Sequence, residues 1–222
     1  MAFILNIETS GPNCSIALAE DGKLLAIRES IGNVHNEKAS LFIQEVFYES
    51  NLPISVLDSV ALSEGPGSYT GLRIGASLAK GLCYALSIPL ISLSSLQIQA
   101  AAEIELAKRE NALIAALTDA RRNEVYASIY DDNLQLVEYL GPHVLTAGSF
   151  NSFLSSRKVI FSGSGASKAQ KVLNSFNAIY SDIHFISSRN MLPLSLKIYN
   201  TRNFVNISSF EPQYLKLFDK AI

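Results

Sequence analysis

Short apolar runs alternate with longer amphipathic stretches along the first half of the chain. Short apolar runs bounded by turn residues are typical of buried strands, whereas apolar positions that recur every three or four residues are typical of helices. The pattern predicts strands at residues 3–7, 15–19, 24–27, 59–63 and 90–93, and helices at residues 37–50, 70–86 and 96–108. The predicted element order is therefore β-β-β-α-β-α-β-α.

The second and third predicted strands are joined by Asp21-Gly22. An Asp-Gly pair between two apolar runs is a strong hairpin signal, because both central residues of a type I′ turn need a positive φ. The pair predicts a tight antiparallel hairpin.

The second half of the chain repeats this pattern. At an offset of 111 residues, Glu8 aligns with Asp119, and residues 14–18 align with residues 125–129 without a gap. The same offset places Asp132-Asn133 on the first hairpin turn. Since Asn tolerates a positive φ, a second hairpin turn is expected there.

Further along, the resemblance between the halves continues in element order. Residues 159–162 and the Gly-rich loop after them echo the strand at 59–63, and residues 185–188 echo the strand at 90–93. Two β-β-β-α-β-α units predict the duplicated α/β fold of the actin, Hsp70 and sugar-kinase group (actin-like, ribonuclease H-like lobes). The alternative is one doubly wound α/β domain.

The repeat predicts a first lobe at residues 1–109 and a second, smaller lobe at residues 110–222. By analogy with other proteins of this fold, the segment from about Leu194 onward is expected to pack back on the first lobe.

Composition excludes several classes of protein. Apolar residues make up 48% of the 222 residues and charged residues 17%, which excludes a disordered or fibrous chain. The formal charge of −2 argues against nucleic-acid binding by bulk electrostatics. Residues 1–110 carry 12 acidic and 7 basic residues, whereas residues 111–222 carry 8 acidic and 11 basic residues. This asymmetry suggests a partner, although a polarised surface is the commoner cause.

Targeting signals and cysteines favour a cytoplasmic protein. Cys14 and Cys83 lie in apolar surroundings without a CxxC spacing, which is typical of a reducing compartment. The N-terminal apolar run contains Glu8 and lacks a basic segment, so no signal peptide is expected. Residues 81–102 are free of charge, but Pro89 and several Ser and Gln residues indicate a buried core segment rather than a membrane span.

The Gly-rich stretch at residues 65–75 is the most informative segment. It is not a Walker A loop, because Leu72-Arg73 follows Gly71 where Lys-Ser/Thr would stand. Gly71, Gly75 and Ala79 form a row of small residues on the following helix, which favours close packing, either within the lobe or against another chain.

The helix at residues 37–50 has a wider apolar surface than one buried face requires. Leu41 and Tyr48 lie outside the main apolar face, with Glu45 between them. An unusually buried helix and an interaction surface both explain this width.

Acidic residues at the strand ends are the candidates for catalysis. Glu8 and Asp119 occupy equivalent places in the two halves, where actin-like ATPases hold magnesium. The adjoining loops contain no Lys or additional Gly typical of a phosphate loop, so a relic of a nucleotide site is the favoured interpretation. His35, His143 and His184 are far apart in sequence, and no metal site is predicted.

Several segments match the pattern of one known family. They are residues 4–10, 65–75, 79–82, 88–90, 94–96 and 119–126, together with Pro212-Gln213-Tyr214-Leu215. Over about residues 3–130 the chain resembles the TsaB (YeaZ) family of bacterial tRNA threonylcarbamoyladenosine biosynthesis proteins. The Gly-rich segment with the helix after it is the most specific part of the match. Glu8 stands where many members have Asp.

The resemblance implies the actin-like fold and a non-catalytic role as the partner of a paralogue, TsaD. TsaD carries the catalytic metal and transfers threonylcarbamoyl from its adenylate to an adenosine beside the anticodon, in tRNAs that read codons beginning with A. The resemblance further implies no cofactor, a TsaE-like ATPase in a larger complex, a homodimer when the chain is alone, and tRNA contact only through the complex.

In this family, pairing uses the two helices of the first lobe. The expected partner interface comprises Leu41, Glu45, Tyr48, Thr70, Gly71, Arg73, Ile74, Gly75, Leu78 and Ala79. Arg73 and Glu45 are expected at its rim. Substitution of Gly75→Leu or Ala79→Arg is expected to abolish pairing and leave the fold intact.

Three alternatives remain at the level of sequence. The main one is a small actin-like kinase or ATPase that uses Glu8 and Asp119 with magnesium. A metallopeptidase rests on distant similarity alone, and the histidine spacing argues against it. Direct tRNA binding would use the basic residues of the second half, namely Arg121, Arg122, Arg157, Lys158, Lys168 and Lys171.

Overall fold

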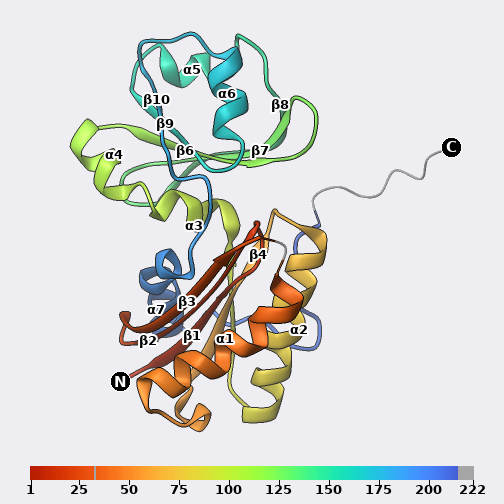
Figure 1. Ribbon diagram of the computed structural model, residues 1–222. Helices are drawn as coiled ribbons and strands as arrows, with labels where there is room; N and C mark the ends of the chain where they lie inside the picture. Colours follow the sequence, from red (N-terminus) through yellow and green to blue (C-terminus); the bar gives the residue numbers. More distant parts are fainter. Residues whose placement is uncertain (33, 215–222) are drawn as a thin grey trace, which may run out of the picture. The chain divides into compact units, whose positions relative to one another are not determined.

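The computed structural model describes residues 1–32 and 34–214, which form two compact units (Figure 1). The first unit contains Met1–Ile98 and Ile186–Tyr214. The second begins at Gln99 and runs to Phe185. Packing rather than internal repetition defines these units, so the lobe boundary predicted between residues 109 and 110 stays a prediction. Leu215, the last residue of the predicted C-terminal motif, lies outside the described residues.

The first unit is built on a five-stranded mixed sheet in the order β3-β2-β1-β4-β5. Strands β1, β2 and β3 are antiparallel neighbours, and β1, β4 and β5 run parallel. The strands are β1 (Phe3–Glu8), β2 (Asn13–Glu20), β3 (Lys23–Ile31), β4 (Ser59–Gly65) and β5 (Leu90–Ser94).

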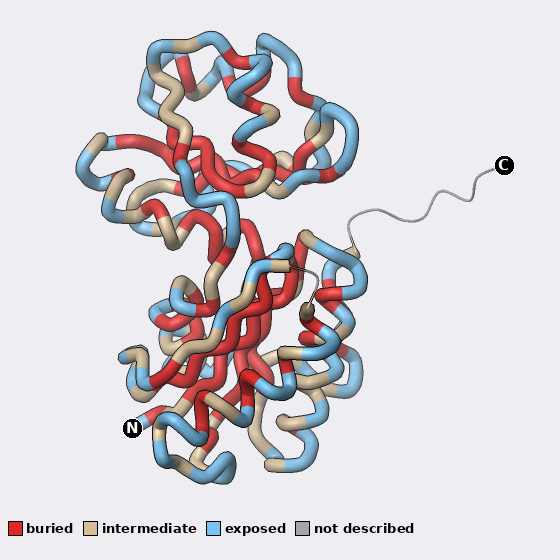
Figure 2. The backbone as a smooth tube through the Cα atoms, in the orientation of Figure 1, coloured by how far each residue is buried: buried red, intermediate tan, exposed pale blue. Residues whose placement is uncertain are grey.

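Helices cover both faces of this sheet. Helices α1 (His35–Ser50) and α2 (Tyr69–Leu86) lie side by side on one face (Figure 1). Helix α7 (Leu192–Thr201) packs on the opposite face, where Leu192 contacts Ala17 and Ala19. Two short 3₁₀ helices, η1 (Ile54–Val56) and η2 (Ser188–Met191), complete the unit. Strands β1, β2 and β4 are almost entirely buried, whereas the edge strand β3 is largely exposed or half-buried (Figure 2).

The second unit repeats the topology of the first. Its sheet has the order β10-β9-β6-β7-β8, which becomes the order of the first sheet when β6 takes the place of β1. Its strands are β6 (Leu113–Asp119), β7 (Glu124–Tyr130), β8 (Leu136–Val144), β9 (Val159–Ser162) and β10 (Ala178–Tyr180). The helices are α3 (Ser95–Ala101), which begins in the first unit, α4 (Ile104–Glu110), α5 (Asn151–Leu154) and α6 (Ala166–Val172). The predicted duplication of a β-β-β-α-β-α unit is confirmed.

The two predicted hairpin turns have different outcomes. Asp21 and Gly22 have φ values of 47° and 75°, as a type I′ turn requires, so the first turn is confirmed. The turn predicted at Asp132-Asn133 is wrong, because the positive φ, 58°, belongs to Leu134. There the Asp131 carboxylate accepts hydrogen bonds from the backbone amides of Asn133 and Gln135, which stabilises a longer loop.

Two other predicted elements differ from the structure. The helix predicted at residues 96–108 is broken between α3 and α4. The break allows Glu103, 2% exposed, to turn inward and accept hydrogen bonds from Ser162 and Ser181. The strand predicted at residues 185–188 is also wrong, because the edge strand beside β9 is β10.

The last described segment runs along the first unit after α7. Val205 forms an antiparallel bridge to Leu90, and the backbone amide of Gln213 donates a 2.7 Å hydrogen bond to the Glu64 carbonyl. The Lys80 ammonium donates to the Phe210 carbonyl at 3.2 Å. The segment after Leu194 therefore packs on the first unit.

Candidate interaction surface

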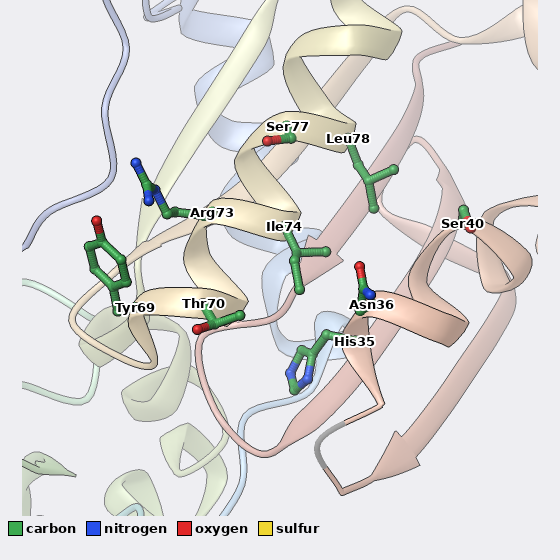
Figure 3. A pocket seen from close by; sticks show the side chains of 9 residues that line it. All are labelled: His35, Asn36, Ser40, Tyr69, Thr70, Arg73, Ile74, Ser77 and Leu78. Atoms are coloured by element: carbon green, nitrogen blue, oxygen red, sulfur yellow. The ribbon is translucent and has the colours of Figure 1, made fainter.

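A groove of about 450 Å³ lies between the N-terminal turns of α1 and α2 (Figure 3). Its apolar floor is formed by Ile74 and Leu78, and hydroxyl and amide groups surround them. The lining residues are His35, Asn36, Ser40, Tyr69, Thr70, Arg73, Ile74, Ser77 and Leu78. Four of the predicted interface residues, Thr70, Arg73, Ile74 and Leu78, thus lie together in one groove.

Helix α1 has an apolar surface on two sides, as the sequence pattern predicted. One side, which includes Phe42 and Val46, is buried in the core against the sheet. Outside it, Leu41 is 46% exposed and Tyr48 is 91% exposed. Glu45, predicted at the rim of the interface, accepts a 3.0 Å hydrogen bond from the Arg28 guanidinium of β3, so its charge is already paired within the chain.

The row of small residues on α2 faces the sheet of its own unit. Gly71, Gly75 and Ala79 are buried. A Cβ atom on Gly71 would overlap the Thr9 carbonyl oxygen, and one on Gly75 would overlap the Thr9 hydroxyl. The Thr9 hydroxyl also donates a 2.8 Å hydrogen bond to the Gly71 carbonyl. Gly71 and Gly75 let α2 approach the end of β1, and all three residues are buried.

This packing corrects the expectation that Gly75→Leu would leave the fold intact. A leucine at position 75 has no room between α2 and Thr9, and an arginine at position 79 would place a charge in the core. Both substitutions should therefore destabilise the folded chain itself, whatever their effect on the binding of a partner.

The groove contains residues that the sequence did not single out. Tyr69 packs on Arg73, whose guanidinium carbon lies 4.8 Å from the ring centroid. Ser77 and Asn36 also line the groove. Positions 69, 73 and 77, four residues apart, share one helix face, and this spacing is the signal that could have identified Tyr69 and Ser77.

His35 is the most unusual residue of the groove. The side chain is buried at the start of α1, and its Nε2 atom has no hydrogen-bond partner among the described residues. An unsatisfied buried polar atom costs about 1–3 kcal/mol. No role was predicted for His35, because a single histidine before a helix forms no recognisable motif.

Glu8 is part of the structure of its loop rather than an open carboxylate. The side chain is fully buried, and its Oε1 accepts 2.6 Å hydrogen bonds from the backbone amide and the hydroxyl of Ser10. Burial raises the pKa of Glu8, although the hydrogen bonds from Ser10 counteract part of this effect. The net effect is that the Glu8 carboxyl is harder to ionise than an exposed one.

Asp119 has a different environment. Its carboxylate, 45% exposed, accepts a 2.8 Å hydrogen bond from the Lys168 ammonium on α6. Partial burial disfavours its charge, but the hydrogen bonds from Lys168 and from the Arg121 amide outweigh this effect and lower the pKa of Asp119. Its cation partner is a side chain of its own unit.

Glu8 and Asp119 each end the first strand of their unit, as predicted, but their side chains face different sides of the two sheets. Leu5 and Ile7 of β1 face the core beneath α1 and α2, so Glu8, the next residue, faces the other side of the sheet. In β6, Leu117 faces the core beneath α6, and Asp119 faces the same side. The hairpins differ by one residue: Ile7 pairs with Ile16, whereas Leu117 pairs with Ala127.

Two of the six basic residues considered for tRNA binding are paired. Lys158 lies 2.8 Å from Glu110, and Lys168 is bound to Asp119. Within residues 1–32 and 34–214, no group of three or more His, Cys, Asp or Glu side chains is placed to hold a metal ion. In the same part of the chain, no helix is long and apolar enough to cross a membrane.

Sequence comparisons identify similar proteins over nearly the whole chain. Residues 29–188 match the family model described as "TsaD: tRNA N6-adenosine threonylcarbamoyltransferase". The chain is 30% identical over 222 residues to "tRNA threonylcarbamoyladenosine biosynthesis protein TsaB" of Haemophilus influenzae, an alignment that covers 96% of this chain and 93% of the relative.

Solved structures share the fold. "YeaZ from Pseudomonas aeruginosa" superposes with a TM-score of 0.80 at 24% identity, covering 96% of this chain and 100% of that structure. An inorganic polyphosphate/ATP-glucomannokinase from Arthrobacter sp. strain KM superposes with a TM-score of 0.51 at 13% identity, covering 90% of this chain and 100% of that structure. With the two repeated sheets, these neighbours identify the fold as a pair of actin-like lobes.

Proposed function

Since the chain belongs to the TsaB family of tRNA threonylcarbamoyladenosine biosynthesis proteins, we propose that it acts there as a non-catalytic subunit. Membership assigns the chain a role in forming N6-threonylcarbamoyladenosine in tRNA. The proposed role is to dock, through α1 and α2, on a TsaD-type threonylcarbamoyltransferase. The tRNAs concerned would be those that read codons beginning with A.

One observation carries this proposal: the apolar and aromatic surface over α1 and α2. Leu41 and Tyr48 are exposed on α1, and the groove with Ile74 and Leu78 lies between the N-terminal turns of α1 and α2. A contiguous apolar surface rimmed by polar residues is typical of a protein-binding site. Exposed tyrosine and arginine are also the residue types enriched in such interfaces.

The environments of the two strand-end acids support a non-catalytic role. Glu8 is buried with a raised pKa, and Asp119 is paired with Lys168 on the helix side of its sheet. Neither arrangement favours the alternative of an actin-like kinase or ATPase that binds magnesium through both residues. The likeness to the glucomannokinase concerns the fold.

The assembly around this chain is a further part of the proposal. The same surface would form a homodimer when the chain is alone, and the TsaD-type partner would replace the second copy. A TsaE-like ATPase would join the larger complex, and tRNA would be contacted through that complex.

The test measures the solution mass of the chain by light scattering, alone and with the TsaD-type protein of the same organism. We expect a one-to-one complex that replaces any self-dimer. Leu41→Glu and Tyr48→Glu should each raise the Kd about tenfold or more, because a charge would enter the apolar surface. Both side chains are exposed, so the fold should be retained.

Phe176→Glu provides the matched control. Phe176 is fully exposed in the second unit and remote in sequence from both helices, so this variant should bind as the wild type does. Absence of any complex at micromolar concentration would contradict the proposal. An intrinsic ATP turnover that is lost in Asp119→Ala would instead favour the hypothesis of an actin-like kinase or ATPase.

A further inference from the structure

Three side chains at one end of α2 contact one another in the order Tyr214, Tyr69 and Arg73, and are called the column below. The ring centroids of Tyr214 and Tyr69 are 4.9 Å apart, with the rings tilted by 47°. The Arg73 guanidinium carbon lies 4.8 Å from the centroid of the same Tyr69 ring. Figure 3 shows Tyr69 and Arg73 side by side at one edge of the groove. The column thus connects the last described residue to a residue of the groove.

The C-terminal segment is held firmly where it meets the column. The Gln213 amide donates a 2.7 Å hydrogen bond to the Glu64 carbonyl, and the Gln213 side chain donates a 2.8 Å hydrogen bond to the Glu64 carboxylate. Lys80 of α2 also binds the Phe210 carbonyl. Tyr214 therefore follows a segment fixed to β4 and α2.

Arg73 is the member of the column that gains most from this support. It is exposed and makes no salt bridge among those found in the described part of the chain. A long exposed side chain loses rotamer freedom when a partner orders it, and this loss weakens binding. Stacking on an aromatic ring orders the guanidinium in advance, with its donors left available at the edges.

We propose that Tyr214 acts as a positioning residue, which holds Tyr69 and through it Arg73 in the orientation that docks on the partner. The C-terminal segment would thereby set the affinity of a surface carried by a helix about 140 positions earlier in the sequence. This inference rests on the proposed function, because it needs a partner on the face of α2.

The experiment is a double-mutant cycle, measured by calorimetry on the full chain with the TsaD-type protein of the same organism. We expect Tyr214→Ala to raise the Kd about two- to tenfold, the range typical of one lost aromatic or cation–π contact. Arg73→Ala should raise it at least as much. In the Arg73→Ala background, Tyr214→Ala should have no further effect, and Tyr214→Phe should bind as the wild type.

Tyr199→Ala is the matched control, because Tyr199 of α7 also packs on an aromatic ring, that of Phe204 at 6.0 Å. It should leave the Kd unchanged. A second readout needs no partner: in the NMR spectrum of the free chain, the Tyr69 ring current should shift the Arg73 side-chain protons upfield, and Tyr214→Ala should reduce that shift.

The outcomes separate the two proposals. If the wild-type chain does not bind, the proposed function fails, and the docking role of Tyr214 fails with it. If the wild type binds and Tyr214→Ala binds equally well, only this inference fails. Additive effects of Tyr214→Ala and Arg73→Ala would also overturn it, because they would show that each residue contacts the partner independently.

Discussion

The two units share one sheet topology but differ in the helices that cover it. In the first unit, α1 and α2 have 16 and 18 residues; in the second, α5 and α6 have 4 and 7. The long helices present an outer face wide enough to expose Leu41, Tyr48 and a groove. The first unit therefore presents a broad helical surface, whereas the helices on the corresponding face of the second unit are shorter.

Exposed apolar residues are also distributed differently in the two units. In the second unit four of them, Leu136, Val137, Tyr139 and Val144, lie on the edge strand β8. This strand contains two register shifts and Pro142, features that protect a sheet edge from pairing with another strand. The exposed apolar residues of β8 therefore lie on an irregular sheet edge, whereas Leu41 and Tyr48 of the first unit lie on a regular helix.

The largest effect should come from the packing of α2 on Thr9. Gly75→Ala should destabilise the chain by about 3 kcal/mol or more, because the new methyl group overlaps the Thr9 hydroxyl. Chemical unfolding followed by circular dichroism would measure this change.

Gly81 on the same helix provides the control. A Cβ there meets nothing within 4 Å, so Gly81→Ala should stabilise the chain by about 0.5–1 kcal/mol. Equal effects of the two substitutions would show that helix propensity, not contact with Thr9, determines the stability of α2.

The second-largest effect is expected on partner binding, when the groove between α1 and α2 is filled. Ser77→Arg should fill the groove between α1 and α2 and raise the Kd for the TsaD-type partner about tenfold or more. Ser152→Arg fills a groove of about 280 Å³ in the second unit and should leave that Kd unchanged. Calorimetry on both variants would decide, and a reversed result would move the docking site to the second unit.

The buried carboxyl of Glu8 should make stability depend on pH. Its pKa is raised in the folded chain, so the folded state keeps a proton that the unfolded state releases above about pH 4.5. Stability is therefore lost as the pH rises from that value through the folded pKa.

Glu8→Gln should remove this dependence and leave the variant more stable than the wild type at pH 7, because a neutral amide can still accept the hydrogen bonds from Ser10. Urea unfolding at a series of pH values from 4 to 8 would measure the effect. A wild-type stability that rises over this range through Glu8 would contradict the assignment.

The smallest effect on stability is expected at Asp119, the residue that aligns with Glu8 in the sequence repeat. Asp119→Asn should cost less than about 1 kcal/mol at neutral pH, because the ion pair with Lys168 is partly exposed to solvent. Thermal unfolding at low and high salt would test this, with the difference between variant and wild type shrinking as salt screens the pair. A loss of several kcal/mol would show a structural role that the geometry does not indicate.

Much of the fold could be predicted from the sequence, because local signals determine most of its elements. Apolar runs located all five strands of the first unit, together with β7 and β9 of the second, and Asp21-Gly22 determined the first hairpin. The errors arose where tertiary contacts decide the structure. Glu103 breaks a helix to reach Ser162 and Ser181, hydroxyls that lie about 60 to 80 positions away in the sequence.

The site was predictable to the extent that a helix pattern reveals an exposed face. Leu41 and Tyr48 are exposed as the excess of apolar positions suggested. The direction of the Gly71 and Gly75 row was not predictable, since a close approach to Thr9 and one to another chain leave the same pattern. Tyr69 and Tyr214 meet only because the C-terminal segment returns to α2.

The return of that segment also sets the order in which the chain can fold during synthesis. Residues 99–185 form a continuous unit, whereas the first unit needs both Met1–Ile98 and Ile186–Tyr214. At typical rates of translation, about ten seconds separate the emergence of Ile98 from that of the returning segment. Among the described residues, the unit that leaves the ribosome first is thus completed last, and helix α2 acquires its final support only when nearly the whole chain has been made.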